Sequence, residues 1–540
     1  MLALRTATRY AWRRPRNIGQ VRLFTNAQGY DAIVLNASSD SGRLSLAESQ
    51  LISQSTRSTI LEQLSVSNFK KAGDVRVLYN VGGVKQVAIV NLGDRKQLNQ
   101  GDNLEGKRLD AARTAAAIGV KALLNQDVQS IGIDISTSAH GAAEGATLAT
   151  HSFDRLKNPK SRKPVVDIGP FLETIENVDP FLTWETGQIY GASQNLARSL
   201  METPANLMTP KIFAEEIAYL LAGLEKVEVI VRDEEWASRQ GMNSLIGVAK
   251  GSEEPLRFLE IQYKGGKEGD APLGLVGKGV TFDSGGISIK PSNNMALMKG
   301  DMGGAATVAG ALYGICKLGL PLNVTAVTPL CENMPSGRAT KPGDVIKAMN
   351  GKSIEVIDTD AEGRLILADA LYYLSSQHKP HSIIDLATLT GAMDVALGNA
   401  FAGVFTNSDN FWKQLDAAGQ FMSDPFWRMP LNDAYLEEMT SSSVADLNNL
   451  GLGRSGGACS AAIFLKQFVS GIENAIPNVS GNPELDDAVE QAENEEKIAW
   501  AHIDIAGVMD SKHSNGYHVK GMSGRPTRSL VELARSIASK

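Results

Sequence analysis

Short apolar segments rich in Val, Ile and Leu alternate with longer helical segments along most of the chain. The first apolar segments are residues 30–37, 74–81 and 85–93, and an Ala-rich helical segment follows at 105–125. Apolar runs of this length, bounded by turn residues, predict β-strands. Strands that alternate with helices predict an α/β domain with a largely parallel sheet. The first part of the chain is therefore expected to form such a domain.

The same alternation resumes after a helical segment that begins near Glu185 and ends before Pro204. Further strands are predicted at residues 226–233, 257–265, 272–279, 322–330, 382–389 and 501–509, with a helix at 303–319. A chain of 540 residues is too long for one hydrophobic core. We place the boundary between residues 185 and 200. This assigns 25–190 to a smaller N-terminal α/β domain and 191–540 to a larger C-terminal α/β domain.

The overall charge argues against two classes of partner. The net charge is −7 and the isoelectric point is about 5.7, so the chain lacks the basic surface expected for nucleic-acid or anionic-membrane binding. No apolar run approaches the roughly 20 residues needed to cross a bilayer. Cys316, Cys331 and Cys459 have neither metal-site nor disulfide spacing, which favours a reducing compartment.

The N-terminus differs from the rest of the chain. Six arginines precede Asp31, the first acidic residue, and apolar residues lie between them. An Arg-rich, acid-free amphipathic start is typical of a mitochondrial transit peptide. We therefore predict a transit peptide at residues 1–24 and a mitochondrial location, in the matrix. The alternative is a disordered basic tail.

A second unusual segment, residues 471–498, is acidic and poor in large apolar side chains. Such a composition cannot build a core of its own. We expect this segment to be an exposed insertion or a partly disordered loop in the C-terminal domain.

Charged residues gather just after several predicted strands of the second domain. They are Lys278, Asp283, Lys290, Asp301, Asp360, Glu362 and Arg364. Functional groups of open α/β sheets gather at the carboxyl ends of the strands. If these loops meet, the repulsion among four carboxylates would force protons onto some of them, or two divalent cations would relieve it. Oxygen ligands suit Zn, Mn, Mg or Co.

Residues 358–371, "DTDAEGRLILADAL", also allow a purely structural interpretation. Thr359 and Glu362 have the spacing of a capping box before an apolar helix. Acidic residues at a helix start are also favoured by the helix dipole. The two interpretations are compatible, because a cap can position Glu362 as a metal ligand.

Six motifs together resemble those of the leucyl aminopeptidase (cytosol aminopeptidase) family. They are "VGKGVTFDSGGISIKP", "DMGGAAT", "PLCENMPSGRATKPGDV", "DTDAEGRLILADAL", "LATLTGAM" and "GMSGRPTRSL". The resemblance covers roughly residues 195–540, with a weaker match at the level of the fold upstream. It implies an N-terminal α/β domain, a C-terminal catalytic domain with two metal ions, and a homohexamer.

The resemblance also implies a set of metal ligands. One ion would be held by Lys278, Asp283, Asp301 and Glu362. The other would be held by Asp283, Glu362 and Asp360, so that two carboxylates bridge the ions. A lysine can bind a metal only as a neutral amine. The expected cofactors are two divalent ions per chain, Zn or Mn, with Mg and Co as alternatives.

The catalytic and substrate-binding residues follow from the same resemblance. Lys290 would polarise the scissile carbonyl, and Arg364 would hold a bicarbonate ion that acts as general base. The residues matching the family's side-chain pocket are Met298, Thr388, Ala506 and Met509. Without the resemblance, ordinary core packing would be the preferred interpretation of these residues. The implied activity is that of a metal-dependent aminopeptidase, which removes N-terminal Leu or similar apolar residues from peptides.

Two alternatives to an active peptidase are considered. One is a weakly active or inactive hexameric scaffold of mitochondria that retains the aminopeptidase fold. The other is a nucleic-acid-binding regulator, against which the acidic balance of the chain argues. All the implied site residues are present, which favours the enzyme. One departure from the family pattern is Asp358, where an Asn is usual; it adds a carboxylate near the metals and affects the expected substrate preference.

Overall fold

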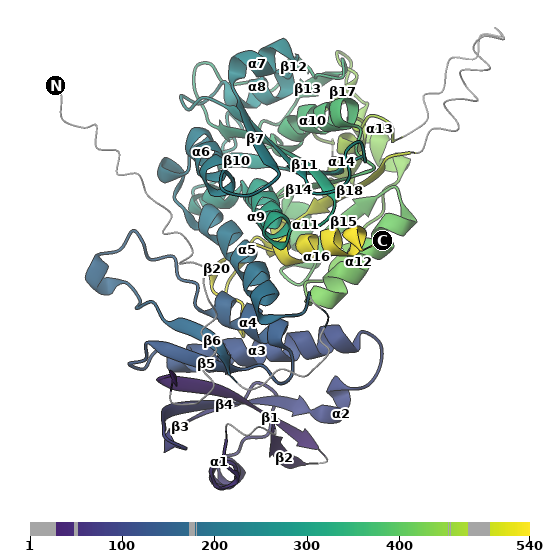
Figure 1. Ribbon diagram of the computed structural model, residues 1–540. Coiled ribbons are helices and arrows are strands. Elements are labelled where there is room, and N and C mark those ends of the chain that lie inside the picture. The colour runs from purple at the N-terminus through teal and green to yellow at the C-terminus, as the bar shows by residue number, and fades with distance from the viewer. Residues whose placement is uncertain are drawn as a thin grey trace. The chain divides into compact units, whose positions relative to one another are not determined.

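The computed structural model describes residues 29–40, 42–47, 52–171, 179, 181–451, 453, 455–472 and 497–539 (Figure 1). The predicted transit peptide lies outside these residues, and so does most of the predicted acidic insertion. The chain divides into two compact units, Met1–Ala192 and Ser193–Lys540. In the described parts of the chain, no helix has the length and apolar character needed to cross a membrane.

The first unit contains a six-stranded mixed sheet in the order β3-β4-β1-β5-β6, with β2 paired to β1. Its strands are β1 (Ala32–Asp40), β2 (Arg43–Leu46), β3 (Val75–Val81), β4 (Val84–Asp94), β5 (Ser130–Asp134) and β6 (Asp167–Phe171). Strands β4, β1, β5 and β6 are parallel neighbours, whereas β3 forms an antiparallel hairpin with β4. The helices are α1 (Gln54–Val66), α2 (Arg95–Leu98), α3 (Leu104–Leu123) and α4 (Ala139–Ala149). The predicted N-terminal α/β domain is confirmed.

The second unit is built on a nine-stranded sheet in the order β16-β15-β18-β14-β9-β11-β8-β7, with β10 beside β11. Its strands are β7 (Val227–Arg232), β8 (Arg257–Lys264), β9 (Leu273–Gly277), β10 (Gly279–Asp283), β11 (Asn323–Asn333), β14 (Ser382–Ala387), β15 (Ala402–Thr406), β16 (Phe426–Arg428) and β18 (Ala499–Asp504). The central strands β18, β14, β9 and β11 run parallel. Their carboxyl ends therefore lie at one edge of the sheet.

Helices cover both faces of this central sheet. Val276 belongs to the core cluster that includes the buried residues of α10 (Gly363–Tyr373). The next residue, Gly277, points to the opposite face and lies directly against α9 (Gly303–Leu318). Successive strand residues alternate between faces, so α9 and α10 cover opposite sides of the sheet. Both helices begin at the edge where the parallel strands end.

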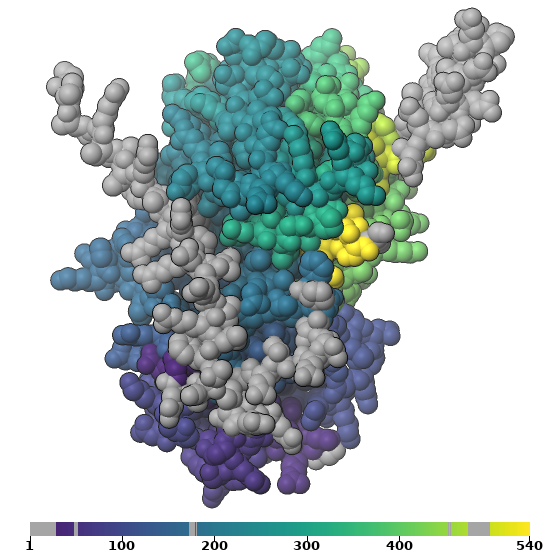
Figure 2. Space-filling model, in the orientation of Figure 1, coloured from purple at the N-terminus to yellow at the C-terminus, as the bar shows by residue number. Residues whose placement is uncertain are grey.

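Shorter elements complete the second unit. The remaining strands are β12 (Asp344–Lys347), β13 (Ser353–Val356), β17 (Leu447–Asn448), β19 (Asp510–Ser511) and β20 (Gly521–Met522). The remaining α-helices are α5 (Trp184–Glu202), which crosses the boundary between the units, α6 (Pro210–Leu221), α7 (Glu234–Arg239), α8 (Asn243–Ala249), α11 (Gly391–Leu397), α12 (Asp409–Met422), α13 (Leu436–Met439), α14 (Gly457–Lys466) and α16 (Thr527–Ala538). Helix α16 packs against α9 and α12, and its yellow end is visible at the surface beside green residues (Figure 2). All three cysteines are free.

Candidate metal centre and active site

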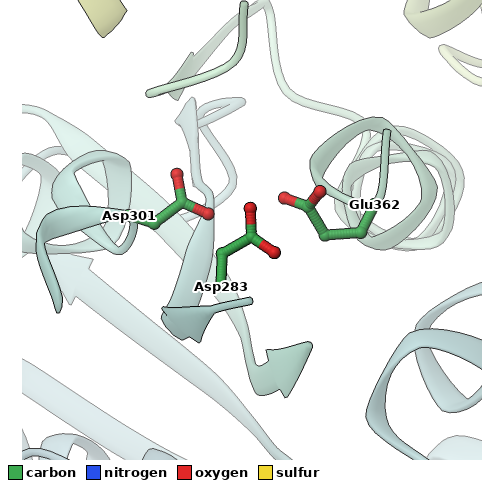
Figure 3. Close-up of side chains that lie close together, drawn as sticks. All are labelled: Asp283, Asp301 and Glu362. Carbon is green, nitrogen blue, oxygen red and sulfur yellow. The ribbon is translucent and has the colours of Figure 1, made fainter. Parts of the chain in front are cut away.

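The charged residues predicted from the sequence meet at the carboxyl ends of neighbouring strands in the second unit. Lys278 follows β9, and Asp283 is the last residue of β10. Asp301 lies between the short helix η4 (Met295–Gly300) and α9, and Glu362 directly precedes α10. Figure 3 shows the carboxylates of Asp283, Asp301 and Glu362 turned towards one another. Segments far apart in the sequence thus contribute to one site, as open α/β sheets favour.

These three carboxylates form a buried cluster. Each offers one oxygen that lies within 4.8 Å of the oxygens of the other two. Asp283 and Glu362 are 2% exposed, and Asp301 is 4% exposed. Carboxylates this close in a buried place cannot all remain ionised without compensating cations. An all-oxygen group of this kind suits a divalent ion. The residues that the structure brings together therefore fit a metal centre.

Lys278 occupies the centre of this cluster. Its Nζ lies 2.8 Å from Asp301 Oδ2 and 2.8 Å from Glu362 Oε1, and it donates a hydrogen bond of 3.0 Å to the carbonyl of Thr388. Burial lowers the pKa of this amine, but the adjacent carboxylates outweigh burial and raise the pKa above its ordinary value. A Cβ on Gly363 would lie 2.8 Å from Lys278 Nζ, so a larger residue at this position would push the Lys278 side chain aside. Lys278 could therefore serve as a metal ligand only after losing its proton.

Lys290 and Asp360 lie on the more open side of the cluster. Lys290 Nζ lies 2.8 Å from Asp283 Oδ2 and forms an ion pair with Asp360 Oδ1. Burial and the neighbouring charge of Asp283 raise the pKa of Asp360 to about 7. The Lys290 side chain is 21% exposed, so its amine can reach both the cluster and an incoming ligand. The structure therefore brings Lys290 and Asp360 to the same site as the three buried carboxylates.

Asn333, at the end of β11, connects the segment that carries Asp283 with the segment that carries Asp360. Asn333 was not identified from the sequence. Its Nδ2 donates to Asp283 Oδ1 at 2.8 Å and to the carbonyl of Thr359 at 3.0 Å. Gly285 supports the same region, since its φ is +89° and its Cβ would lie 2.9 Å from Asp360 Oδ1. Asn333 ends an apolar strand, which is where functional residues gather. Its side chain is a neutral amide, however, and so gave no reason to connect Asn333 with a metal cluster.

The capping-box interpretation of residues 358–371 is wrong. Helix α10 begins at Gly363 with Glu362 as the N-cap residue, and no side-chain hydrogen bond caps it. The hydroxyl of Thr359 instead donates to the carbonyl of Gly285 at 2.7 Å and accepts from the amide of Ser288 at 2.8 Å. Thr359 therefore ties the ligand loop to the loop after β10. This leaves the Glu362 carboxylate free to face the cluster.

Arg364 lies in the first turn of α10 and is 4% exposed. Its Nε and Nη1 are buried and have no hydrogen-bond partner among the described residues. Burial lowers the pKa of Arg364 to about 10, although the carboxylates of Glu362 and Asp504 act in the opposite direction. Buried donors of a charged group need partners. The guanidinium, whose Nε and Nη1 have no hydrogen-bond partner among the described residues, is therefore suited to hold a small anion beside the cluster.

Two of the four predicted pocket residues, Met298 and Thr388, contact Asp301 directly. Thr388 donates from Oγ1 to Asp301 Oδ1 at 2.7 Å, and Asp301 N donates to the carbonyl of Met298 at 3.2 Å. Ala506 opens the short helix η7 (Ala506–Val508), and its amide donates to Asp504 Oδ1 at 3.1 Å. The Cε of Met509 lies 3.2 Å from the place where a Cβ on Gly300 would stand. Met298, Thr388 and Met509 therefore lie beside the segment that carries Asp301.

Asp358, the departure from the family pattern, accepts a hydrogen bond of 2.8 Å from the amide of Asp360. Asn449 holds the same loop from the other side, since its Nδ2 donates to the carbonyl of Asp358 at 2.5 Å and its Oδ1 accepts from the amide of Ile357 at 2.9 Å. Asp358 therefore orders the loop that carries Asp360.

Comparison with known proteins supports this geometry. The model of the cytosol aminopeptidase family catalytic domain matches residues 195–531, and the model of the family's N-terminal domain matches residues 34–160. The chain belongs to the cytosol aminopeptidase family. It is 46% identical over 495 residues to the cytosol aminopeptidase of Dictyostelium discoideum, covering 90% of this chain and 89% of that protein. It is also 46% identical over 468 residues to the human cytosol aminopeptidase, covering 86% and 83% of the two chains.

Solved structures of similar proteins share the fold. The bottromycin maturation enzyme BotP, in complex with Mn, superposes with a TM-score of 0.76 at 30% identity, covering 94% of this chain and 99% of that one. A mutant of tomato leucine aminopeptidase superposes with a TM-score of 0.75 at 29% identity, covering 94% of each chain. As a member of the cytosol aminopeptidase family, the chain is a metal-dependent aminopeptidase, and the predicted two-domain α/β fold is confirmed.

Proposed function

We propose that this aminopeptidase removes N-terminal Leu and similar apolar residues from peptides, using two divalent metal ions per chain. The observation that carries the proposal is the buried cluster of Asp283, Asp301 and Glu362, whose oxygens lie within 4.8 Å of one another. Lys278 and Lys290 supply compensating charge in the same cluster. Met298 and Met509, on segments near Asp301, would supply the preference for an apolar side chain.

Within this proposal, Lys278, Asp283, Asp301 and Glu362 hold one ion, and Asp283, Asp360 and Glu362 hold the other. The ions, Zn or Mn with Mg and Co as alternatives, would neutralise the carboxylates and supply an activated water and a site for the substrate's free amine. The Mn in the BotP structure supports an ion of this kind. The carboxylates position what they bind because Asn333, Gly285 and Thr388 fix their orientations by hydrogen bonds.

Lys290 and Arg364 have the catalytic roles. Lys290 donates to the peptide carbonyl as negative charge develops on its oxygen, the kind of interaction that contributes most to many such reactions. Arg364 would hold a bicarbonate ion through Nε and Nη1, which have no other partner in the described part of the chain, and bound bicarbonate would supply a general base. Met298, Thr388, Ala506 and Met509 line the pocket for the N-terminal side chain.

The proposal extends to the place and form in which the enzyme works. Its substrates are peptides, and it assembles as a homohexamer in the mitochondrial matrix. The Arg-rich, acid-free sequence of residues 1–24 supports the location. Nothing in the charge of the chain favours nucleic acid or membrane as a partner.

A hydrolysis panel tests the proposed function. The purified protein, first stripped of metal, is loaded separately with Zn, Mn, Mg and Co and is given aminoacyl-anilides that differ only in the amino acid. Leu-anilide and Met-anilide are expected to be cleaved fastest, and an N-acetylated Leu-anilide, which lacks the free amine, is expected to resist cleavage. Binding of two metals without cleavage of any aminoacyl-anilide would instead favour the scaffold.

A further inference from the structure

Gly300, the last residue of η4, leaves room for two methionine side chains that reach it from another part of the chain. A Cβ at this position would lie 2.6 Å from Met522 Cε, 2.8 Å from Met522 Sδ and 3.2 Å from Met509 Cε. Real Cβ atoms essentially never have neighbours closer than 3.0 Å, so a side chain at this position would force the tip of Met522 to move. Met509 and Met522 therefore press against the same point of the backbone, directly before Asp301.

The backbone keeps these two methionines together. Strands β19 and β20 pair Asp510 with Met522, and the amide of Ser523 donates to the carbonyl of Met509 at 2.9 Å. Met522 lies in β20, and Met509 directly precedes its partner strand β19. Met509 is half-buried, whereas Met522 is 4% exposed. Met522 is therefore the inner member of the pair.

Glu202, at the end of α5, binds both the segment that carries Gly300 and the segment that carries Met522. Its Oε1 accepts from the amide of Met522 at 2.7 Å, and its Oε2 lies 2.8 Å from Lys299 Nζ. Lys299 also donates to the carbonyl of Glu202 at 3.0 Å. A Cβ on Gly521 would lie 2.2 Å from Glu202 Oε1, so Gly521 is needed for this contact. One carboxylate thus holds both sides of the Gly300–Met522 contact in place.

From this arrangement we infer that Met522 is a specificity-determining residue, which sets the depth of the side-chain pocket from behind Met509. The inference rests on the proposed function, because it takes Met298 and Met509 as pocket residues. Met298 and Gly300 belong to the same short helix, η4, so Met522 contacts the segment that carries the proposed pocket residue Met298. Methionine is flexible and fills irregular space, so an inner methionine limits the pocket without closing it to one substrate.

The test compares Met522→Ala with the unmodified protein on Leu-anilide and Phe-anilide. Removing the thioether deepens the pocket, so the ratio of kcat/KM for Phe-anilide to that for Leu-anilide is expected to rise. One methylene in an apolar pocket changes such ratios by roughly 10-fold to 200-fold. The change should fall mainly in KM, because an apolar contact with the substrate side chain stabilises the bound substrate and the transition state equally.

Two further variants separate specificity from stability. Met439→Ala truncates a fully buried methionine of α13, in the main core cluster, and should leave the ratio unchanged even if it lowers the melting temperature. Met522→Leu conserves volume and should keep the ratio close to that of the unmodified protein. If Met522→Ala does not fold, Met522→Val, which removes less volume, makes the same comparison.

The outcomes are distinct. A ratio within twofold of the unmodified value in a folded Met522→Ala or Met522→Val variant overturns the inference and leaves the proposed function standing. An equal shift of the ratio in Met439→Ala also overturns it, because the effect would then come from general loosening. If the unmodified protein cleaves neither anilide under any metal, the proposed function fails and the inference fails with it.

Discussion

At the scale of single residues, Glu362 and Lys290 lie in one charged cluster but are expected to fail in different ways when removed. Glu362 is buried, contacts Lys278 and faces two other carboxylates, so Glu362→Ala should abolish both metal binding and activity. Lys290 contacts the cluster from its open side, so Lys290→Ala should keep two metals per chain. Loss of one oxyanion donor typically lowers the rate by about 10²–10³. Elemental analysis and Leu-anilide kinetics on the same samples measure both effects.

Lys341→Ala is the matched control for this pair, because Lys341 makes an exposed ion pair with Asp344. It should change neither metal content nor rate. Retention of both metals by Glu362→Ala would show that the cluster is not the metal site. Full activity of Lys290→Ala would show that another group polarises the carbonyl.

His518 is expected to make the folded state sensitive to acid. Burial, together with the nearby Arg525 and Arg528, lowers the pKa of His518 from 6.5 to about 3. Between these values the unfolded chain binds a proton that the folded chain does not, so stability is lost as the pH falls from about 6.5 towards 3. His518→Gln removes the group that takes up this proton. The free energy of unfolding of this variant should therefore fall less between pH 7 and pH 4, by on the order of 2 kcal/mol.

Urea unfolding at pH 7 and pH 4 gives the change in the free energy of unfolding for each protein. The difference between the two changes is the contribution of His518. His513→Gln is the control, because that residue is exposed. Equal acid sensitivity of His518→Gln and the unmodified protein would contradict the prediction.

At the scale of elements, the strands and long helices were predictable because each follows from a local pattern. The apolar run at 272–279 became β9 and the Gly- and Ala-rich run at 303–319 became α9. The contacts between loops were not predictable in this way. Thr359 had the spacing of a helix cap, but its hydroxyl binds the loop after β10, 74 residues away in sequence. Only the folded sheet places those two loops together.

The approach of α9 to the sheet depends on Gly304. A Cβ there would lie 2.0 Å from the carbonyl oxygen of Leu386 and 2.7 Å from the amide of Lys278, both of them backbone atoms that cannot move aside cheaply. Gly304→Ala should therefore push α9 away from β9 and β14 and displace Asp301 at its start. Overpacking costs typically 1–3 kcal/mol and occasionally more, and we expect about 3 kcal/mol or more here.

Thermal unfolding and metal content of Gly304→Ala check this expectation. Gly223→Ala is the control, because a Cβ at Gly223 meets no atom within 4 Å and its φ is not positive. If Gly304→Ala were as stable as the control, α9 could move away from the sheet at little cost, and the prediction would be wrong.

Deleting residues 474–497 should leave folding and assembly intact. The described residues on either side already meet, because the amide of Ile498 donates to the carbonyl of Gly471 at 3.0 Å. A short link of two glycines can therefore replace the segment without moving β18, whose far end carries Asp504. Circular dichroism, size-exclusion chromatography and the anilide panel measure the result. Loss of the folded state would show that the deleted residues pack against the core.

At the scale of the whole molecule, the site depends on distant parts of the second unit. Lys278, Asp283 and Asp301 could be recognised in sequence because charged residues after apolar strands are uncommon and because they match a family motif. Asn333, Asn449 and Asp504 escaped recognition, because each acts by holding a loop and nothing in the local sequence distinguishes such a residue from an ordinary polar one. The same limit applies to Met522, which reaches Gly300 from more than 200 residues away in sequence.

The N-terminal presequence leads to the last prediction, which concerns where the molecule is found. The described structure begins at Gly29, and β1 begins at Ala32, so removal of the chain before Phe24 leaves every described contact of the first strand in place. Arg22 lies two residues before Phe24, and an acid-free, Arg-rich segment precedes it. Protein recovered from mitochondria should therefore begin near Phe24 by N-terminal mass spectrometry.

A fluorescent protein fused to residues 1–31 should be found in mitochondria. Its import should be abolished when Arg9, Arg13, Arg14 and Arg16 are replaced with Glu. A mitochondrial protein still beginning at Met1, or a fusion that stays in the cytosol, would mean that the basic segment is a tail with no targeting role.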